Sequence, residues 1–159
     1  MIKKKIYTWR DVEKMCSQLL VQLYNSEWRP DYIVGITRGG NVPATILSNM
    51  TGIRCEAVKV ALRDGESGKT GDSISWMADD AKLGKNILVV DDINDTGATF
   101  EWLSNDWGLN GGDNVRFATL TENLSSNFDG VDYYCDEVNK AEEDVWLVYP
   151  WENVGEYNG

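Results

Sequence analysis

The segment from Asn86 to Thr99 constrains the fold of this chain more than any other part of the sequence. The run Asn86-Ile-Leu-Val-Val90 predicts a buried strand, and the apolar residues after Thr99 predict a helix that begins near that threonine. The polar segment Asp91-Asp-Ile-Asn-Asp-Thr-Gly-Ala-Thr99 joins the two. A strand that passes through a short glycine-containing loop directly into a helix is typical of a parallel α/β sheet.

The sequence before this run shows the same alternation. Tyr32-Ile-Val-Gly-Ile36 predicts a second buried strand, and the loop Thr37-Arg-Gly-Gly40 follows it. A helix is predicted to begin at Pro43 and to end at Gly52, and a further strand follows at about 54–60. This order of elements predicts an α/β fold with a mostly parallel central sheet flanked by helices.

A helix is also predicted near the amino terminus. Thr8 is a suitable N-cap and Asp11 is suited to the first turn. Apolar residues then recur at helical spacing, at Val12, Met15, Cys16, Leu19 and Leu23. We expect this apolar stripe to face the core.

Three later segments complete the pattern. From Leu62 to Gly84 the sequence is polar and glycine-rich without a sustained period, which indicates a long loop, either a functional lid or a surface insertion. Val115 to Leu120 predicts another strand. The carboxyl-terminal part is rich in aromatic residues, namely Tyr133, Tyr134, Trp146, Tyr149 and Trp151. No internal repeat or linker divides the chain, so we predict a single domain over residues 1–159.

Composition excludes several functions. The net charge of −11 disfavours nucleic acid and anionic membranes as partners, because both require a basic surface. The chain contains no histidine, which excludes Ser-His-Asp catalysis and histidine-based zinc sites. General acid–base chemistry then falls most naturally to the 26 aspartates and glutamates.

The cysteines and the amino terminus bear on location. Cys16, Cys55 and Cys135 are far apart and odd in number, which favours free thiols in a reducing compartment over disulfides or a zinc site. The basic residues of the first segment are not followed by an apolar run, so we expect no signal peptide. With no segment apolar enough to cross a bilayer, the expected location is the cytoplasm.

The segment between the strand and the helix predicts a binding site. Asp95-Thr-Gly-Ala-Thr99 supplies successive N–H groups, a glycine and two hydroxyls at a helix N-terminus, which suits a phosphate group. Asp91 and Asp92 supply the hard oxygen ligands that Mg²⁺ prefers. A phosphate cradle beside such a pair predicts a phosphorylated substrate that binds a metal.

Val89-Val-Asp-Asp-Ile-Asn-Asp-Thr-Gly-Ala-Thr99 closely resembles the phosphoribosyl pyrophosphate motif of the type I phosphoribosyltransferases. Four further segments resemble the bacterial xanthine-guanine phosphoribosyltransferases: Thr8-Trp9, Ile36-Thr-Arg-Gly-Gly-Asn-Val-Pro43, Gly52-Ile-Arg54 and Asp144-Val-Trp-Leu-Val-Tyr-Pro-Trp-Glu152. The resemblance implies the type I fold with a flexible lid at about 62–84 and a small hood at about 133–155. It also implies a Mg²⁺-dependent enzyme of purine salvage, which transfers 5-phosphoribose from phosphoribosyl pyrophosphate to guanine, xanthine or hypoxanthine. The relatives form homodimers or homotetramers, so the same is expected here.

The resemblance also implies roles for the residues of the central motif. Asp92 would bind the magnesium ion and the ribose hydroxyls, with Asp91 beside it. Asp95 would act as the catalytic carboxylate that handles the proton on the purine ring. The 5-phosphate would be bound by the loop that runs from Asp95 through Thr96, Gly97, Ala98 and Thr99.

Other segments would complete the site. The resemblance implies that Arg38 and Gly39 bind pyrophosphate, with Lys69 of the lid as the basic residue best placed to join them. It further implies that Trp146 stacks on the purine and that the Leu147 backbone meets the edge of the base. A lid and a cation at the leaving group suit this reaction, because the sugar becomes cationic and must be kept from water.

One position departs from the family. A lysine that donates to the exocyclic oxygen of a 6-oxopurine is expected after the strand at 115–120, and the matching residue here is Asn123. An amide can donate or accept a hydrogen bond, so the sequence leaves the choice of base open.

Two other functions account for parts of the sequence. Ile87-Leu-Val-Val-Asp-Asp92 also resembles the start of a receiver domain, but too few residues follow it for such a domain, and the cradle would be unexplained. A phosphoribosyltransferase fold that binds ligands and regulates without catalysis is the second alternative. The negative charge and the presence of Asp95 both favour the enzyme.

Overall fold

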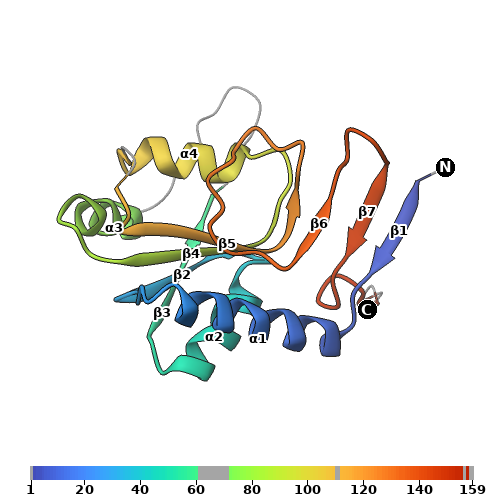
Figure 1. Ribbon diagram of the computed structural model, residues 1–159, viewed down its shortest axis with the longest axis horizontal. Helices are drawn as coiled ribbons and strands as arrows, with labels where there is room; N and C mark the ends of the chain where they lie inside the picture. The colour runs from blue at the N-terminus through green and yellow to red at the C-terminus, as the bar shows by residue number, and fades with distance from the viewer. Residues whose placement is uncertain (1, 61–71, 110–111, 156, 158–159) are drawn as a thin grey trace.

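The computed structural model describes residues 2–60, 72–109, 112–155 and 157. A parallel five-stranded sheet with the order β3-β2-β4-β5-β6 forms its centre (Figure 1). Its strands are β2 (Tyr32–Thr37), β3 (Cys55–Lys59), β4 (Ile87–Asn94), β5 (Val115–Asn123) and β6 (Asp136–Val138). The predicted mostly parallel α/β fold is confirmed.

Two pairs of helices cover the two faces of this sheet (Figure 1). One face carries α1 (Trp9–Asn25) and α2 (Asn41–Thr51), and the other carries α3 (Asp72–Lys82) and α4 (Ala98–Asp106). Successive strand residues point to opposite faces, so Leu88 and Val90 join the core under α1 and α2 while Ile87 and Val89 join the other core. The near-continuous apolar run of β4 is therefore explained by burial on both sides.

The first helix matches its prediction closely. Thr8 caps α1 through a reciprocal pair of bonds: its hydroxyl accepts from the Asp11 N–H, and the Asp11 carboxylate accepts from the Thr8 N–H. The buried residues of α1 are the predicted stripe, Val12, Met15, Cys16, Leu19 and Leu23. Residues 16, 55 and 135 are free cysteines, as predicted.

The predicted bounds of two elements need small corrections. The helix expected from Pro43 begins at Asn41, so Pro43 lies inside its first turn, where the missing N–H costs nothing. It ends as predicted at Gly52, which adopts the left-handed conformation. β5 continues past Leu120 to Asn123, because its later residues pair with β4 and β6.

The prediction that residues 62–84 form one long loop is wrong for their second half. Residues 72–82 form α3, and Met77, Ala78 and Ala81 are buried in the core that lies under α4. Their helical spacing went unrecognised because the exposed residues between them are strongly polar. Lys69 and the rest of the predicted lid lie outside the described residues.

A second, two-stranded sheet lies beside the main sheet. Here β1 (Lys3–Ile6) pairs in parallel with β7 (Val145–Val148), so an early and a late segment of the chain lie side by side (Figure 1). Tyr133 and β6, which precede β7, instead extend the main sheet beyond β5. The segment at 133–155 thus contributes both to the main sheet and to the small one.

Aromatic rings and hydroxyls join the small sheet to the main one. Tyr149 stacks on Tyr7 at 4.9 Å and on Trp151 at 4.8 Å between ring centres. Its buried hydroxyl lies 2.7 Å from the Thr121 hydroxyl and donates to the Asp92 carbonyl at 3.0 Å. Burial raises the pKa of Tyr149 well above its usual range, which keeps the hydroxyl protonated as a donor.

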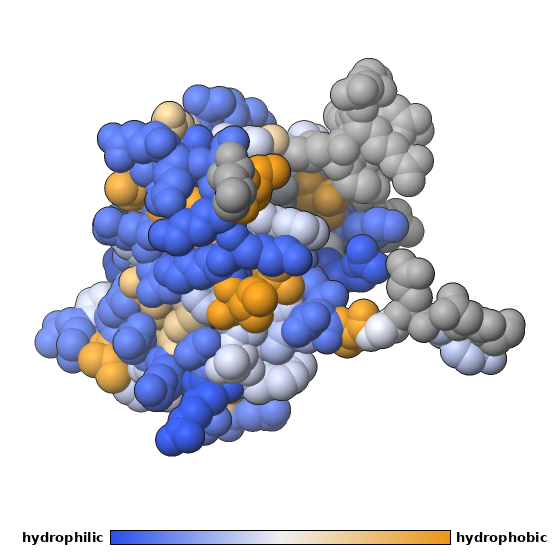
Figure 2. Space-filling model, turned by 90° about the vertical axis from the view of Figure 1, so that its right-hand side faces the viewer, coloured by the Kyte–Doolittle hydropathy of each residue, from blue (hydrophilic) through white to orange (hydrophobic). Residues whose placement is uncertain are grey.

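The outer surface fits the composition. None of the helices in the described ranges is long and apolar enough to span a bilayer. The face that carries the small sheet is mainly hydrophilic, with small separate hydrophobic areas (Figure 2).

We expect Tyr149→Phe to lower the free energy of unfolding by about 1–3 kcal/mol, because the change removes the hydroxyl that donates to the Asp92 carbonyl and leaves the Thr121 hydroxyl with Tyr7 as its remaining hydroxyl partner. Urea denaturation measures this difference. Tyr157→Phe is the matched control, since Tyr157 is 94% exposed. Equal midpoints for the two variants would show that the tyrosine hydroxyl does not hold the two sheets together.

Candidate active site

A cleft of about 960 Å³ opens at the carboxyl end of the central strands. β2 pairs with β4 only as far as Gly35 and Val90, whereas β4 continues beside β5 to Asn94 and Glu122. The chain leaves β2 toward β3 on one side and returns to β4 on the other. Open α/β sheets bind ligands at such a reversal of strand order. The cleft is lined mainly by the end of β2, the end of β4 and the carboxyl-terminal segment, and Val42 of α2 and Val60 after β3 also line it.

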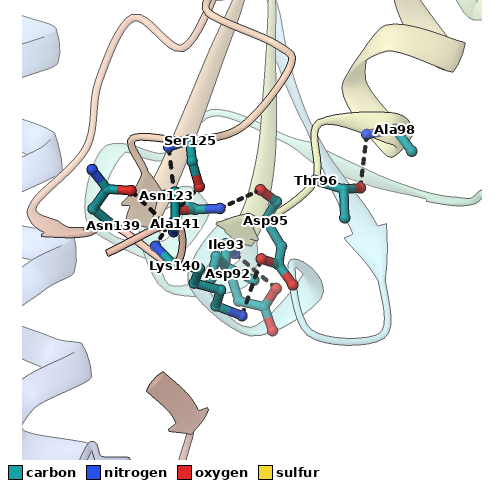
Figure 3. Close-up of polar contacts among 10 residues, drawn as sticks. All are labelled: Asp92, Ile93, Asp95, Thr96, Ala98, Asn123, Ser125, Asn139, Lys140 and Ala141. Carbon is teal, nitrogen blue, oxygen red and sulfur yellow. Dashed lines mark hydrogen bonds and ion pairs between the residues drawn. The ribbon is translucent and has the colours of Figure 1, made fainter. Parts of the chain in front are cut away.

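The predicted phosphate cradle lines a smaller hollow of about 190 Å³ beside this cleft. The hollow is bounded by residues 91–100, and it shares Asp91, Asp92, Ile93, Asp95 and Thr99 with the cleft. Of the N–H groups at 95–99, that of Ala98 donates to the Thr96 hydroxyl at 3.2 Å (Figure 3), and the other four donate to no acceptor in the described chain. The loop therefore presents free donors at the N-terminus of α4, as an anion site requires.

Gly97 gives the cradle its shape. Its φ is 94°, and a Cβ atom there would lie 2.5 Å from the Phe128 backbone nitrogen. Behind the cradle, the buried Asn94 amide donates to Glu122 at 2.7 Å and to the Phe128 carbonyl at 2.9 Å. Asn94 and Glu122 thus fix the loop on which Gly97 rests, a role that the sequence did not indicate.

The acidic pair lies inside β4, which continues to Asn94, rather than following the strand. The Asp92 N–H donates to the Asp91 carboxylate at 2.8 Å, and the Ile93 N–H donates to the Asp92 carboxylate at 2.8 Å. Burial and the charge of Asp92 hold the pKa of Asp91 well above its usual range. Burial also raises the pKa of Asp92. Neither carboxylate has a basic partner among the ion pairs of the described residues.

These two carboxylates fit a divalent cation. Two anions in a poorly solvated place repel each other, and a cation between them would remove that cost. No cluster of three potential ligands occurs in the described ranges. Mg²⁺ is commonly held by one or two carboxylates, with water and substrate oxygens completing its shell, so Asp91 and Asp92 would suffice.

The loop after β2 lies against this pair. Arg38 is exposed and lines the cleft, and Gly39 packs so closely on Asp92 that a Cβ atom at Gly39 would overlap the Asp92 carboxylate. A side chain at this position would force the Asp92 carboxylate or the loop to move. The structure brings both predicted pyrophosphate-binding residues to the acidic pair.

Asp95 faces a cation that the sequence did not single out (Figure 3). The Lys140 ammonium lies 3.0 Å from the Asp95 carboxylate, and both residues line the cleft. Asn123, predicted to meet the purine, is 5% exposed and is not among the residues that line the cleft. Its amide donates instead to the Asp95 carbonyl at 2.8 Å. The sequence held one signal that could have pointed to this cation: Lys140 is the sole basic residue after Arg116.

The carboxyl-terminal segment forms the opposite wall of the cleft. Trp146 is 57% exposed and Leu147 is buried, and both line the cleft. The Lys4 ammonium lies 4.7 Å from the centre of the Trp146 ring, so the cross-strand neighbour of Trp146 steadies it. Tyr149 and Trp151 line the same wall.

Comparisons with known proteins identify the family of the chain. Residues 3–150 match the family described as Phosphoribosyl transferase domain. The chain is 34% identical to the xanthine-guanine phosphoribosyltransferase of Cereibacter sphaeroides over 137 residues, which is 84% of this chain and 74% of that protein.

Solved structures share the fold. A purine phosphoribosyltransferase from Pyrococcus horikoshii superposes with a TM-score of 0.73 at 25% identity, covering 99% of both chains. A Neisseria gonorrhoeae hypothetical protein with bound ppGpp gives 0.71 at 26% identity over 97% of this chain and 92% of that one. The xanthine-guanine-hypoxanthine phosphoribosyltransferase of Helicobacter pylori gives 0.68 at 20% identity over 94% of each chain and supports the fold alone.

We expect Asp91→Asn to raise the free energy of unfolding by roughly 1 kcal/mol at neutral pH in the presence of a chelator, because it removes a buried charge from the pair. Urea denaturation measures the change, and the exposed Asp113→Asn is the control. Added Mg²⁺ should reduce the difference in free energy of unfolding between Asp91→Asn and the parent, since it stabilises the parent through binding. If Asp91→Asn were instead less stable than the parent, other groups of the protein would already offset the repulsion between the two carboxylates.

Proposed function

The chain belongs to the phosphoribosyl transferase domain family, and on this basis we propose that it transfers 5-phosphoribose from phosphoribosyl pyrophosphate to a purine base in purine salvage. The observation that supports this most is the continuity of the phosphate cradle, the acidic pair and the Trp146 wall around one cleft. A substrate with a phosphate at one end and a planar base at the other fits that arrangement.

The donor would lie along the carboxyl ends of β4 and β2. The N–H groups and hydroxyls of the cradle, from Asp95 through Thr96, Gly97, Ala98 and Thr99, would bind the 5-phosphate. Arg38 and the Gly39 backbone would bind the pyrophosphate, because they lie beside the acidic pair at the other end of the ribose site. Lys69 stays a prediction for the same group.

Asp91 and Asp92 would hold Mg²⁺ against the donor. When bound, the ion would offset negative charge on the pyrophosphate as it leaves. Around it, Arg38 adds a second positive charge, and the hydrophobic wall limits the water that could attack the cationic sugar.

The base would lie against Trp146, with the Leu147 backbone at its edge. In the reaction, a bond forms between the purine N9 and the anomeric carbon while the bond from that carbon to pyrophosphate breaks. The ring must lose one proton overall. Asp95 lines the cleft between the cradle and the Trp146 wall, where its carboxylate can take that proton.

Asp95→Asn should lower the rate of nucleotide formation roughly a hundredfold or more, because the amide keeps the shape of the carboxylate but accepts no proton. The assay uses donor, Mg²⁺ and a panel of nucleobases, with Asp113→Asn as a surface control. An unchanged rate would remove Asp95 from the chemistry. Binding of the donor by the parent without any nucleotide formed would favour a regulatory protein of the same fold.

Gly39→Ala should lower the rate by about a hundredfold, because the new methyl group displaces the Asp92 carboxylate or the pyrophosphate loop. Gly155→Ala is the matched control, since a Cβ atom at Gly155 meets nothing within 4 Å. Rates are compared at saturating donor and base. Parent-like activity of Gly39→Ala would show that the Asp92 position is not critical.

We also propose, on the resemblance alone, that the protein acts in the cytoplasm as a homodimer or homotetramer without nucleic acid or membrane partners. Its negative charge supports the last part of this proposal.

A further inference from the structure

The chain at the carboxyl end of β5 lies behind the phosphate cradle and is anchored to β4. Asn94, the last residue of β4, pairs with Glu122 of β5 in the strand register. The two residues are 3% and 8% exposed, and the Asn94 amide donates to both the Glu122 carboxylate and the Phe128 carbonyl. The segment 122–128 is therefore fixed to the strand that leads directly into the cradle.

The same segment binds two carbonyl groups of the cradle. The Asn123 side-chain nitrogen donates to the Asp95 carbonyl at 2.8 Å (Figure 3). The Asn127 N–H donates to the Thr96 carbonyl at 2.9 Å. Both carbonyls therefore face the segment 122–128.

These two bonds set the direction of two N–H groups. The peptide units of the cradle are trans, and in a planar trans peptide the N–H points opposite to the C=O. The Asp95 carbonyl shares its peptide unit with the Thr96 N–H, and the Thr96 carbonyl shares its unit with the Gly97 N–H. In the described chain the hollow is lined by residues 91–100 and by none of residues 122–128. Both N–H groups are thus turned away from the anchoring segment and toward the hollow.

The Asn123 side chain is itself held in place through its oxygen. That atom accepts from the Ser125 hydroxyl and from the Lys140 N–H, each at 3.0 Å, which leaves the nitrogen facing Asp95. Asn123 is 5% exposed and does not line the cleft. A side chain in this place can affect a ligand only through the peptide group that it binds.

We infer that Asn123 and Asn127 are positioning residues for the 5-phosphate, a conclusion that rests on the proposed function. By binding two carbonyls of the cradle, they direct the Thr96 and Gly97 N–H groups toward the phosphate. Donors that already point at an anion bind it without the cost of turning the peptide first. Removal of the Asn123 donor should therefore weaken binding of the sugar phosphate and not of the base.

Asn123→Asp tests this role, because the carboxylate keeps the accepting oxygen and replaces the donor with a second oxygen. We expect the Kd for ribose 5-phosphate and the KM for phosphoribosyl pyrophosphate to rise by about ten- to a hundredfold, as for the loss of one hydrogen bond to a charged group. The kcat and the KM for the base should change much less, since saturating donor fills the weakened site. Calorimetry and steady-state rates measure these constants.

Two further variants separate the lost donor from the added charge. Asn123→Ala removes the donor without adding a charge, and it should show the same loss of affinity. Asn139→Asp is the matched control, because the Asn139 oxygen accepts from the Ala141 N–H while its nitrogen donates to no acceptor in the described chain. A loss confined to Asn123→Asp, or an equal loss in Asn139→Asp, would assign the effect to charge and overturn the inference.

The parent protein allows a measurement that does not depend on the folding of a variant. In its amide NMR spectrum, the Thr96 and Gly97 resonances should shift when ribose 5-phosphate is added, and by more than that of Asn127, whose N–H is already bonded. Absence of binding, or binding that leaves these two resonances in place, would overturn the inference. A parent that shows both shifts but forms no nucleotide from any base would contradict the proposed function and leave the positioning role intact.

Discussion

The pairing of β4 determines most of what this protein can bind. As far as Val90 the strand has a neighbour on each side, and beyond Val90 it follows β5 alone. The loss of one neighbour exposes the flank of Asp91 and Asp92 to the loop after β2, and the remaining neighbour keeps the acidic pair in a rigid extended backbone. A flexible turn at this point would allow the two carboxylates to separate into water, whereas the strand holds them together at a cost that a cation relieves.

The small sheet and the main sheet meet at the same place. Tyr149 donates to the Asp92 carbonyl and takes part in the aromatic stack that supports the wall with Trp146. The wall proposed to bind the base is therefore attached to the backbone that carries the proposed metal ligand. Because β1 pairs with β7, both ends of the chain contribute to this wall. Its geometry consequently depends on contacts between residues more than a hundred positions apart.

The local parts of the site could be predicted from sequence because each depends on neighbours in the chain. The strand, the acidic pair and the cradle at 95–99 are continuous, and their order alone indicates a phosphate site at a helix N-terminus. The α1 stripe and the Thr8 cap are local for the same reason. The helix at 72–82 was missed because a polar composition concealed the few residues that reach the core.

Asn123 and Lys140 show what sequence could not decide. Alignment with a family compares positions along the chain, and it placed Asn123 where a lysine was expected. In space the amide lies beneath the cleft, and a lysine seventeen residues later supplies a cation at Asp95. The sequence by itself determined the α/β class, the phosphate cradle and the acidic pair, since these arise from short-range pattern. The tertiary structure alone decided which side chains share the cleft, because the charges that a ligand meets there belong to residues that are close in space, whatever their separation in the sequence.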